Sequence, residues 1–384
     1  MDFKAKALEV NDYVVEMRHK FHRHPEPSME EFWTTDTIAA ELDAMGIPYR
    51  RLDPTGLVAD IKGGKEGKTI ALRADIDALA QNEKTDLPFK SEVDGMMHAC
   101  GHDTHAAQLL GAAKILNGMK DELCGNVRLV FQPGEEVAQG ARAVIAQGGL
   151  DGVDAIFGIH IGGGSPKGVV GWCPGGSASA ADMFRIVVKG ESGHGSQPEN
   201  TVDATVCAAA IVMNLQTMVS RELPPTKPVV VTVGKLVSGT RFNIISGEAV
   251  LEGTCRSYDY DLHHALPGIM ERIVKNTAAA YRCTAEVEYN MLTEVLVNND
   301  EILDLVKAAA YKVVDDPEQV KQSPPMMGAE DFADYTVVTK GAFVHVGGGS
   351  KEPNHSDHIV FDEDSFRTSV ALHCQVAYDY LMGE

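Results

Sequence analysis

Apolar side chains follow two alternating patterns along the first 160 residues. Helical spacing predicts helices over residues 2–24, 28–45, 104–119 and 140–147, the second of them ending at Gly46 and Pro48. Short apolar runs predict buried strands at residues 56–62, 69–74, 126–132 and 155–160. Strands that alternate with helices predict an α/β fold with a mostly parallel sheet covered by helices.

The pattern changes near Asp182, where the predicted elements become strand, helix, strand, strand, helix, strand. They cover residues 183–190, 201–221, 229–237, 246–257, 261–281 and 283–290. This order is typical of the ferredoxin-like α+β unit. We therefore predict an inserted domain over residues 183–293 within a main domain formed by residues 1–182 and 294–384. The main domain continues with a helix at 299–314, a strand at 341–348 and a helix at 363–382.

Composition and charge exclude several classes of partner. The 384 residues carry a net charge of −21, which repels phosphate backbones, so we expect no nucleic-acid partner. The N-terminal residues have no long apolar segment, and no run of about 18 apolar residues occurs, so we expect neither a secretory signal nor a membrane span. Seven scattered cysteines suggest a reduced chain, and we expect a soluble, cytoplasmic protein.

Polar side chains gather where the predicted strands end. Asp75 and Asp77 follow one strand, Glu135 and Glu136 follow another, and His160 ends a third. The segment 354–358 follows the strand at 341–348, and Cys100 and His102 stand just before a helix. Since sites in open α/β sheets form beyond the carboxyl ends of the strands, we expect these groups to converge.

A cysteine, three histidines and a glutamate suit Zn²⁺, or Mn²⁺, Co²⁺ or Ni²⁺ by substitution. Five ligands exceed the four of one tetrahedral zinc, so the set favours two metals about 3.5–4 Å apart that share a bridging ligand. Of the neighbouring pair Glu135 and Glu136, one can bind metal while the other acts as a base toward water.

Other interpretations of the cluster remain open from these residues alone. Cys100 before a helix, with histidines nearby, could be a covalent nucleophile. That interpretation leaves Glu135, Glu136, His160 and His355 without a role, which favours the metal site. A closed structural zinc site would favour paired CxxC motifs, which this chain lacks.

Nine motifs, in order, carry a family resemblance that covers essentially the whole chain. They are "FHRHPEPSMEE" (21–31), "LRADIDAL" (72–79), "MHACGHDTH" (97–105), "FQPGEE" (131–136), "DGVDAIFGIHI" (151–161), "GHGSQPENTVDA" (193–204), "GTRFNIISGEAVLEGTCR" (239–256), "MGAEDF" (327–332) and "NHSDHIVFDE" (354–363). With them the chain resembles the di-metal aminoacylase and hippurate hydrolase-type amidohydrolases, relatives of auxin-conjugate hydrolases and co-catalytic zinc carboxypeptidases.

The resemblance implies that the main domain is a di-metal catalytic domain and assigns roles to its residues. It implies two divalent metals, with Glu135 as the general base and Asp77 as the residue that orients a ligand. The implied metal ligands are Cys100, which bridges, and His102, Glu136, His160 and His355. His358 competes with His355 for the last ligand position. The sequence departs from the family pattern at Ala80, Gly134 and Val137.

For the inserted domain, the resemblance implies a lid that also forms a homodimer or higher homo-oligomer. His194 matches a histidine that stabilises the oxyanion, in some relatives from a partner subunit. Asn243 and Arg256 match positions that contact substrate, and Arg256 or Arg241 with Asn243 is a candidate partner for a substrate carboxylate.

The expected activity is hydrolysis of the amide bond of a small N-acyl L-amino acid to a carboxylic acid and a free amino acid. The first alternative is a dipeptidase or aminopeptidase that uses the same site. The second is a binding protein with a degenerate site, against which the intact Glu135 and ligand set argue.

Overall fold

A computed structural model describes residues 1–383; Glu384, the last residue of the predicted main domain, lies outside them. The chain divides into two compact units. The first unit comprises Met1–Gly175, Val297–Pro324 and the chain from Asp331 onward, and the second comprises Gly176–Leu296 and Pro325–Glu330. The sequence places these divisions at 182/183 and 293/294, within seven and three residues, but it assigned Pro325–Glu330 to the main domain, whereas this segment belongs to the second unit.

The first unit is built on an eight-stranded sheet in the order β1-β2-β4-β3-β5-β16-β6-β15. Its strands are β1 (Tyr49–Arg51), β2 (Leu57–Lys62), β3 (Lys65–Asp75), β4 (Cys124–Gln132), β5 (Ala155–Gly162), β6 (Val170–Trp172), β15 (Val320–Gln322) and β16 (Lys340–Gly347). The central strands β4, β3, β5 and β16 are parallel, and β1, β2 and β6 pair antiparallel at the sides. The α/β fold class with a mainly parallel sheet is confirmed.

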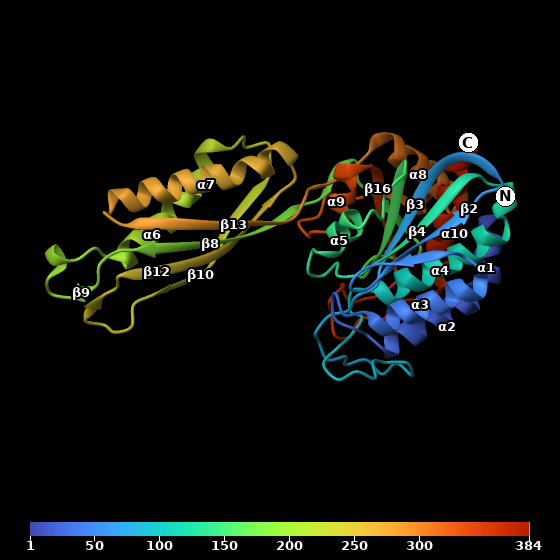
Figure 1. Ribbon diagram of the computed structural model, residues 1–384, viewed down its shortest axis with the longest axis horizontal. Coiled ribbons are helices and arrows are strands. Elements are labelled where there is room, and N and C mark those ends of the chain that lie inside the picture. Colours follow the sequence, from blue (N-terminus) through green and yellow to red (C-terminus); the bar gives the residue numbers. More distant parts are fainter. Residues whose placement is uncertain (384) are drawn as a thin grey trace. The chain divides into compact units, whose positions relative to one another are not determined.

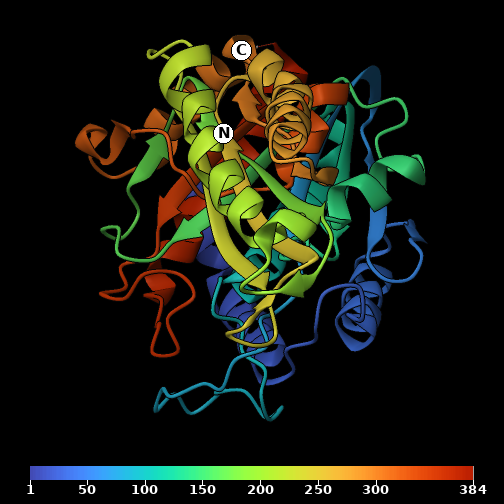
Figure 2. The ribbon, with the colours of Figure 1, turned by 90° about the vertical axis from the view of Figure 1, so that its left-hand side faces the viewer.

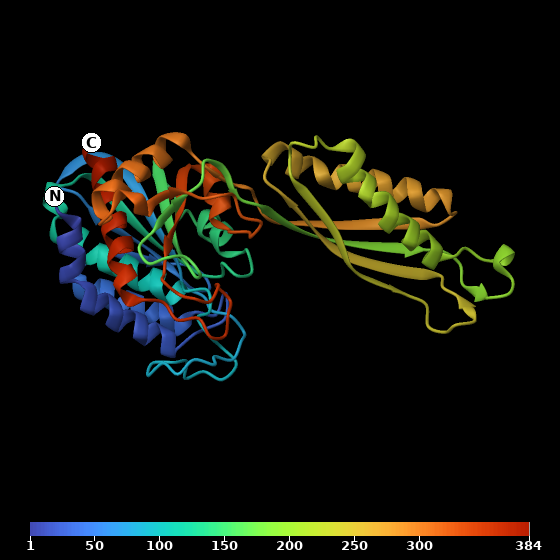
Figure 3. The same cartoon turned by 180° about the vertical axis from the view of Figure 1, so that it is seen from behind.

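Helices cover both faces of this sheet (Figures 1 and 3). They are α1 (Phe3–Glu9), α2 (Asn11–Arg23), α3 (Phe32–Met45), α4 (His102–Gly118), α5 (Gly140–Ala146), α8 (Asp300–Val313), α9 (Phe332–Val338) and α10 (Phe366–Met382). On one face α4 and α10 pack on β3, and on the other α5 packs on β4 and α9 on β16. The predicted helix over 2–24 is two helices that meet at Val10, and α9 was not predicted.

The second unit is the predicted ferredoxin-like unit. Its antiparallel sheet has the order β10-β12-β8-β13, formed by β8 (Ala180–Lys189), β10 (Val229–Ser238), β12 (Glu248–Ser257) and β13 (Thr284–Thr293). Two helices, α6 (Ala204–Thr217) and α7 (Tyr260–Ala280), pack against each other over this sheet (Figure 2). A short strand pair accompanies it, β9 (Gly193–His194) with β11 (Ile244–Ile245). A second pair, β7 (Gly175–Ala178) with β14 (Leu296–Asn298), has residues of both units, where the chain passes from one to the other.

Strand register brings the polar segments of the first unit to one edge of its sheet. Asp75 at the end of β3 pairs with Gln132 at the end of β4, and His160 on β5 pairs with His345 on β16. The loops that follow these strands therefore begin at the same edge, as in other parallel sheets. Among residues 1–383, no helix combines the length and apolar character that crossing a membrane requires.

Candidate metal centre

Gly101 sets the positions of Cys100 and His102 at the start of α4. Its φ of +98° lies in the left-handed region that favours glycine. A Cβ atom at this position would lie 2.5 Å from Ile161 Cγ2 on β5. The glycine therefore allows Cys100 and His102 to approach the end of β5 closely.

Two sets of potential metal donors meet at Cys100. The first is Cys100, His102 and His160, and the second is Cys100, Glu136 and His355; within each set the donor atoms lie within 4.8 Å of one another. Cys100 Sγ lies 3.3 Å from His160 Nε2, and His355 Nε2 lies 3.5 Å from Glu136 Oε1. The structure thus brings together all five residues expected as ligands, with the thiol common to both sets.

Asp77 contacts one residue of each donor set, His102 and Glu136. Its Oδ1 lies 3.1 Å from His102 Nδ1, and its Oδ2 accepts hydrogen bonds from the Glu136 amide at 3.0 Å and from the Ser28 hydroxyl at 2.6 Å. Burial alone would raise the pKa of Asp77, but these hydrogen bonds outweigh it and lower the pKa. The ionised carboxylate therefore holds the His102 ring with Nε2 directed away from Asp77.

Two buried side-chain atoms without hydrogen-bond partners show whether these residues suit a cation. His102 Nε2 and Glu136 Oε1 are buried and make no hydrogen bond within the described chain. Buried polar atoms nearly always have a partner, so two such atoms in donor sets that share Cys100 are suited to bind a cation. His160 Nδ1 donates to the Ile161 carbonyl at 2.7 Å, and burial lowers the pKa of His160 well below its usual value. This neutral imidazole, with the thiol and carboxylate, fits a divalent cation of the zinc class.

Glu135 lies beside both donor sets without being a member of either one. It forms a third potential donor set with His102 and Glu136, and its Oε2 lies 3.8 Å from His102 Nε2. Its side chain is mostly buried, with 10% of its area exposed. Glu135 therefore has a carboxylate within 4.8 Å of donor atoms of His102 and Glu136, one from each of the two sets.

Asn354 is a site residue to which the sequence analysis assigned no role. Its Nδ2 donates to the Cys100 carbonyl at 2.7 Å and to the Ile161 carbonyl at 3.2 Å, and its Oδ1 accepts from the Gly163 amide at 2.6 Å. The next residue, His355, has a φ of +69°, which is strained for a non-glycine residue, and its amide donates to the Ala99 carbonyl. Asn354 thus joins the three segments that carry Cys100, His160 and His355.

Two further buried residues position the donor loops. Glu31 Oε1 accepts a hydrogen bond from the Gly134 amide at 2.8 Å, just before Glu135. His105 Nδ1 lies 2.5 Å from Asp75 Oδ1, and His105 Nε2 accepts a hydrogen bond from the Ile161 amide at 2.8 Å. Glu31 and His105 stand in the motifs "FHRHPEPSMEE" and "MHACGHDTH", so the motifs could have indicated them, but their partners could not be read from the sequence.

The remaining predicted site residues lie outside this cluster. His194, Asn243 and Arg256 are in the second unit, where Gly195 next to His194 donates to the Asn243 carbonyl at 2.9 Å. Arg256 lies on β12 and donates to the Cys255 carbonyl at 3.0 Å. In the first unit, His358 is exposed, and its Nδ1 lies 2.5 Å from Asp357.

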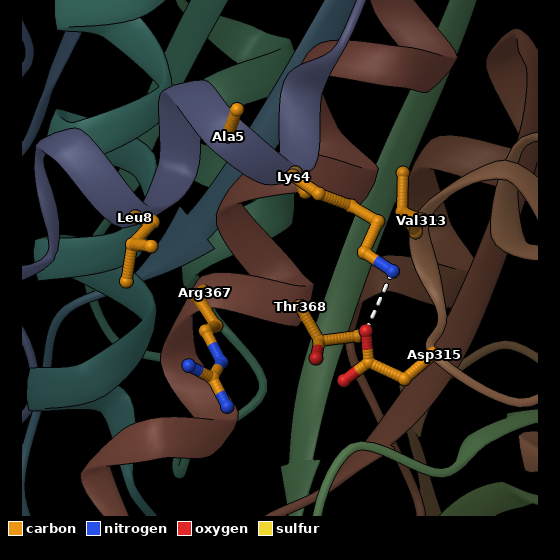
Figure 4. Close-up of a pocket in the computed structure, with 8 residues that line it drawn as sticks. Lys4, Ala5, Leu8, Val313, Asp315, Arg367 and Thr368 are labelled. Atoms are coloured by element: carbon orange, nitrogen blue, oxygen red, sulfur yellow. Dashed lines mark ion pairs between the residues drawn. The ribbon is translucent and has the colours of Figure 1, made fainter.

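A separate pocket of about 240 Å³ lies in the first unit (Figure 4). Lys4 and Asp315 form an ion pair at this pocket. Its lining residues are Lys4, Ala5, Leu8, Val313, Asp315, Arg367, Thr368 and Ala371, and they include no predicted site residue. The candidate site is therefore identified by its converging donors and not by this pocket.

The chain is similar to known proteins along nearly its whole length. Residues 71–379 match the model of peptidase family M20/M25/M40. Thermostable carboxypeptidase 1 of Saccharolobus solfataricus is 37% identical over 98% of each chain. N-acetylcysteine deacetylase of Bacillus subtilis is 37% identical over 95% of this chain and 96% of its own. The crystal structure of the Bacillus subtilis YXEP protein, described as a dinuclear metal binding peptidase from the M20 family, superposes with a TM-score of 0.86. It is 34% identical and covers 97% of this chain and 99% of its own.

Proposed function

Because this chain belongs to peptidase family M20/M25/M40 and is thus a hydrolase, we propose that it hydrolyses the amide bond of N-acyl L-amino acids. The products are a carboxylic acid and a free amino acid. The observation that carries the proposal is the pair of donor sets that share Cys100 with Glu135 beside them. The similarity to N-acetylcysteine deacetylase supports an N-acyl amino acid as the substrate class.

Two divalent cations would occupy the donor sets. Cys100 would contribute to both, with His102 and His160 on one side and Glu136 and His355 on the other. When bound, such a pair polarises a carbonyl and lowers the pKa of water toward about 7. The similarity to a dinuclear metal binding peptidase supports this number of cations, and zinc, manganese, cobalt and nickel all suit the donors.

Glu135 is the proposed proton carrier. Its carboxylate takes a proton from the attacking water as the new bond to the amide carbon forms. It then gives this proton to the amine nitrogen as the carbon–nitrogen bond breaks. The hydrogen bond from the Gly134 amide to Glu31 and that from the Glu136 amide to Asp77 fix the backbone on both sides of Glu135.

His194 is the proposed donor to the oxyanion that forms on the substrate carbonyl. The Ser196 amide donates to His194 Nδ1 at 3.2 Å, so the neutral ring carries its hydrogen on Nε2. An exposed Nε2–H is the group that an oxyanion requires. Asn243 and Arg256 of the same unit are proposed to contact the substrate, with the guanidinium as a partner for its carboxylate.

A product-release assay tests the proposal. The purified chain is supplied with Zn²⁺, Mn²⁺ or Co²⁺ and incubated with N-acetyl, N-benzoyl and N-arylacetyl amino acids and with dipeptides that have a free amine. Release of amino acid from the N-acyl compounds supports the proposal. Turnover of the dipeptides alone would show that the chain is a peptidase instead.

Peptide hydrolysis at the same site is the second candidate, and the similarity to thermostable carboxypeptidase 1 favours it. A carboxypeptidase and an N-acyl amino acid hydrolase both cut an amide next to a free α-carboxylate. They differ in what lies on the acyl side. A panel that extends the acyl group from acetyl to a blocked peptide therefore separates the two activities.

We also propose that the second unit forms a homodimer. Strand β10 is an edge strand with exposed Val230, Leu236 and Val237, and the neighbouring α6 exposes Met213. An edge strand with apolar side chains is suited to pairing with a second copy. Sedimentation of the wild-type chain and of Leu236→Lys tests this: a dimer that becomes a monomer is expected, and a wild-type monomer would contradict it.

A further inference from the structure

The second unit contains a compact group of metal-ligating side chains that the reaction does not use. His263 and His264 lie in the first turns of α7, and Glu294 follows the end of β13. One donor atom from each of these residues lies within 4.8 Å of the other two. All three residues belong to the second unit, whereas the donor sets around Cys100 belong to the first.

Their separations fit a small cation. Glu294 Oε2 lies 3.3 Å from His263 Nδ1 and 3.1 Å from His264 Nε2. Ligands about 2.0–2.1 Å from a tetrahedral zinc are roughly 3.4 Å apart. The two imidazoles and one carboxylate are also the ligand types that zinc takes in sites with three protein ligands.

The environment of His263 supplies a second, independent observation. The residue is fully buried, and its Nδ1 has no hydrogen-bond partner within the described chain. On the other side of the ring, Nε2 lies 2.8 Å from Asp182 Oδ1, and the Tyr289 hydroxyl donates to Asp182 Oδ2 at 2.7 Å. A ligand histidine usually donates its other ring N–H to a carboxylate, which fixes the ring and its tautomer.

This tautomer creates an electrostatic requirement. With the hydrogen of the neutral ring on Nε2, the Nδ1 lone pair faces the carboxylate of Glu294 at 3.3 Å. Two electron-pair donors in this arrangement repel each other unless a positive species lies between them. That species is either a proton on Nδ1 or a cation shared by all three side chains.

We propose that His263, His264 and Glu294 form a further metal site that binds one zinc-class transition-metal ion. The three side chains supply three ligands, and Asp182 holds His263 in the binding orientation. The fourth coordination position is taken by water because His264 is partly exposed, at 40% of its side-chain area. The bound ion ties the start of α7 to the segment that follows β13.

Protonation competes with this metal ion. Burial lowers the pKa of His263, but the carboxylates of Asp182 and Glu294 outweigh it and raise the pKa to about 9. His264 also faces Glu294, and Tyr289 and Cys255 lie on the far side of Asp182. Metal binding therefore competes with a proton on Nδ1, so the affinity should rise with pH.

The test counts metal ions per full-length chain. Wild type, His264→Ala, Glu294→Gln and the control Glu271→Gln are dialysed against excess Zn²⁺, freed of loose ion by gel filtration and measured by mass spectrometry. Glu271 is an exposed carboxylate on the same helix, paired with Lys275, so its replacement removes charge but no ligand. We expect His264→Ala and Glu294→Gln to hold one zinc fewer than wild type and the control. Equal zinc content in all four proteins would overturn the proposal.

Proton release provides a second readout that does not depend on activity or on the other metal ions. Calorimetric zinc titrations at pH 7 in buffers of different ionisation enthalpy give the number of protons released per chain. Wild type should release at least one proton more than Glu294→Gln, and its affinity for this equivalent should rise between pH 7 and pH 9. If both proteins release the same number of protons, the site is an ion pair and not a metal site.

Discussion

The side-chain amide of Asn354 donates a hydrogen bond to the backbone carbonyl of Cys100 at 2.7 Å. The same NH₂ group reaches the Ile161 carbonyl at the end of β5, and the amide oxygen accepts from Gly163. One side chain therefore fixes the thiol loop against the strand that carries His160. Because the next residue is His355, the same contacts hold the start of the His355 segment against this loop and strand.

Asn354→Asp should weaken metal binding while the fold remains intact. The aspartate keeps an oxygen for the Gly163 amide but faces the Cys100 and Ile161 carbonyls with oxygen instead of N–H. We expect a 10- to 100-fold loss of zinc affinity, the range typical for residues that orient ligands. Competition titration with a chromophoric chelator measures it, and circular dichroism checks the fold. Unchanged affinity would show that Asn354 has no positioning role.

Much of the site could be anticipated from strand ends. The apolar runs at 69–74, 126–132 and 155–160 are strands in the structure, and the polar residues after them meet at one edge because the strands are parallel. Cys100, Glu136 and His355 are far apart in sequence, yet this topology places their donor atoms within 4.8 Å. Residue type and strand order were sufficient for that part.

The supporting contacts could not be anticipated, because they depend on backbone geometry. Asn354 binds three main-chain groups, the carbonyls of Cys100 and Ile161 and the amide of Gly163, which come from two separate segments. A sequence shows an asparagine before a histidine but not the carbonyl that the asparagine faces. The break between α1 and α2 at Val10 was missed for the same reason, since the apolar spacing continues across it.

Gly101→Ala should disrupt the metal centre, whereas Gly95→Ala should not. Both glycines have positive φ, +98° and +77°, so alanine strains the backbone at either position by about 1–2 kcal/mol. A Cβ at Gly95 meets open space, but one at Gly101 lies 2.5 Å from Ile161 Cγ2. We expect both variants to lose some thermal stability and only Gly101→Ala to lose bound metal. Equal metal content in the two would contradict the close approach at Gly101.

Glu135→Gln should slow hydrolysis strongly and retain the metal ions. The amide keeps the shape of the side chain but can no longer accept the proton of water, so kcat should fall by about 10²–10⁴-fold. Metal content should equal that of wild type, since Glu135 lies outside the two sets that share Cys100. The matched control is Glu352→Gln, an exposed carboxylate in the loop before His355. Full activity of Glu135→Gln would show that Glu135 is not the general base.

Cys100→Ser distinguishes a metal ligand from a covalent nucleophile. Cys100 is the donor common to both sets, so its replacement should lower the metal content of the protein. Activity should fall in proportion to the metal lost. Metal content by mass spectrometry and activity are measured on the same sample. Full metal content with no activity would instead support a nucleophilic thiol, as would a covalent acyl adduct on the wild-type protein.

The stability of the second unit should depend on pH through His263. Burial by itself lowers the pKa of this imidazole, but Asp182 and Glu294 raise it from 6.5 to about 9. A raised histidine pKa stabilises the folded state fully below about pH 6.5, and this contribution is lost as the pH rises through 9. The shift corresponds to a contribution on the order of 3 kcal/mol.

Hydrogen exchange of the α7 amides between pH 6 and pH 10, in the presence of a chelator, reports this local stability after correction for the intrinsic exchange rate. Glu294→Gln removes one of the two carboxylates, so its loss of protection should be smaller and should begin at lower pH. If the two proteins lose protection in parallel, His263 does not carry the charge that links α7 to β8.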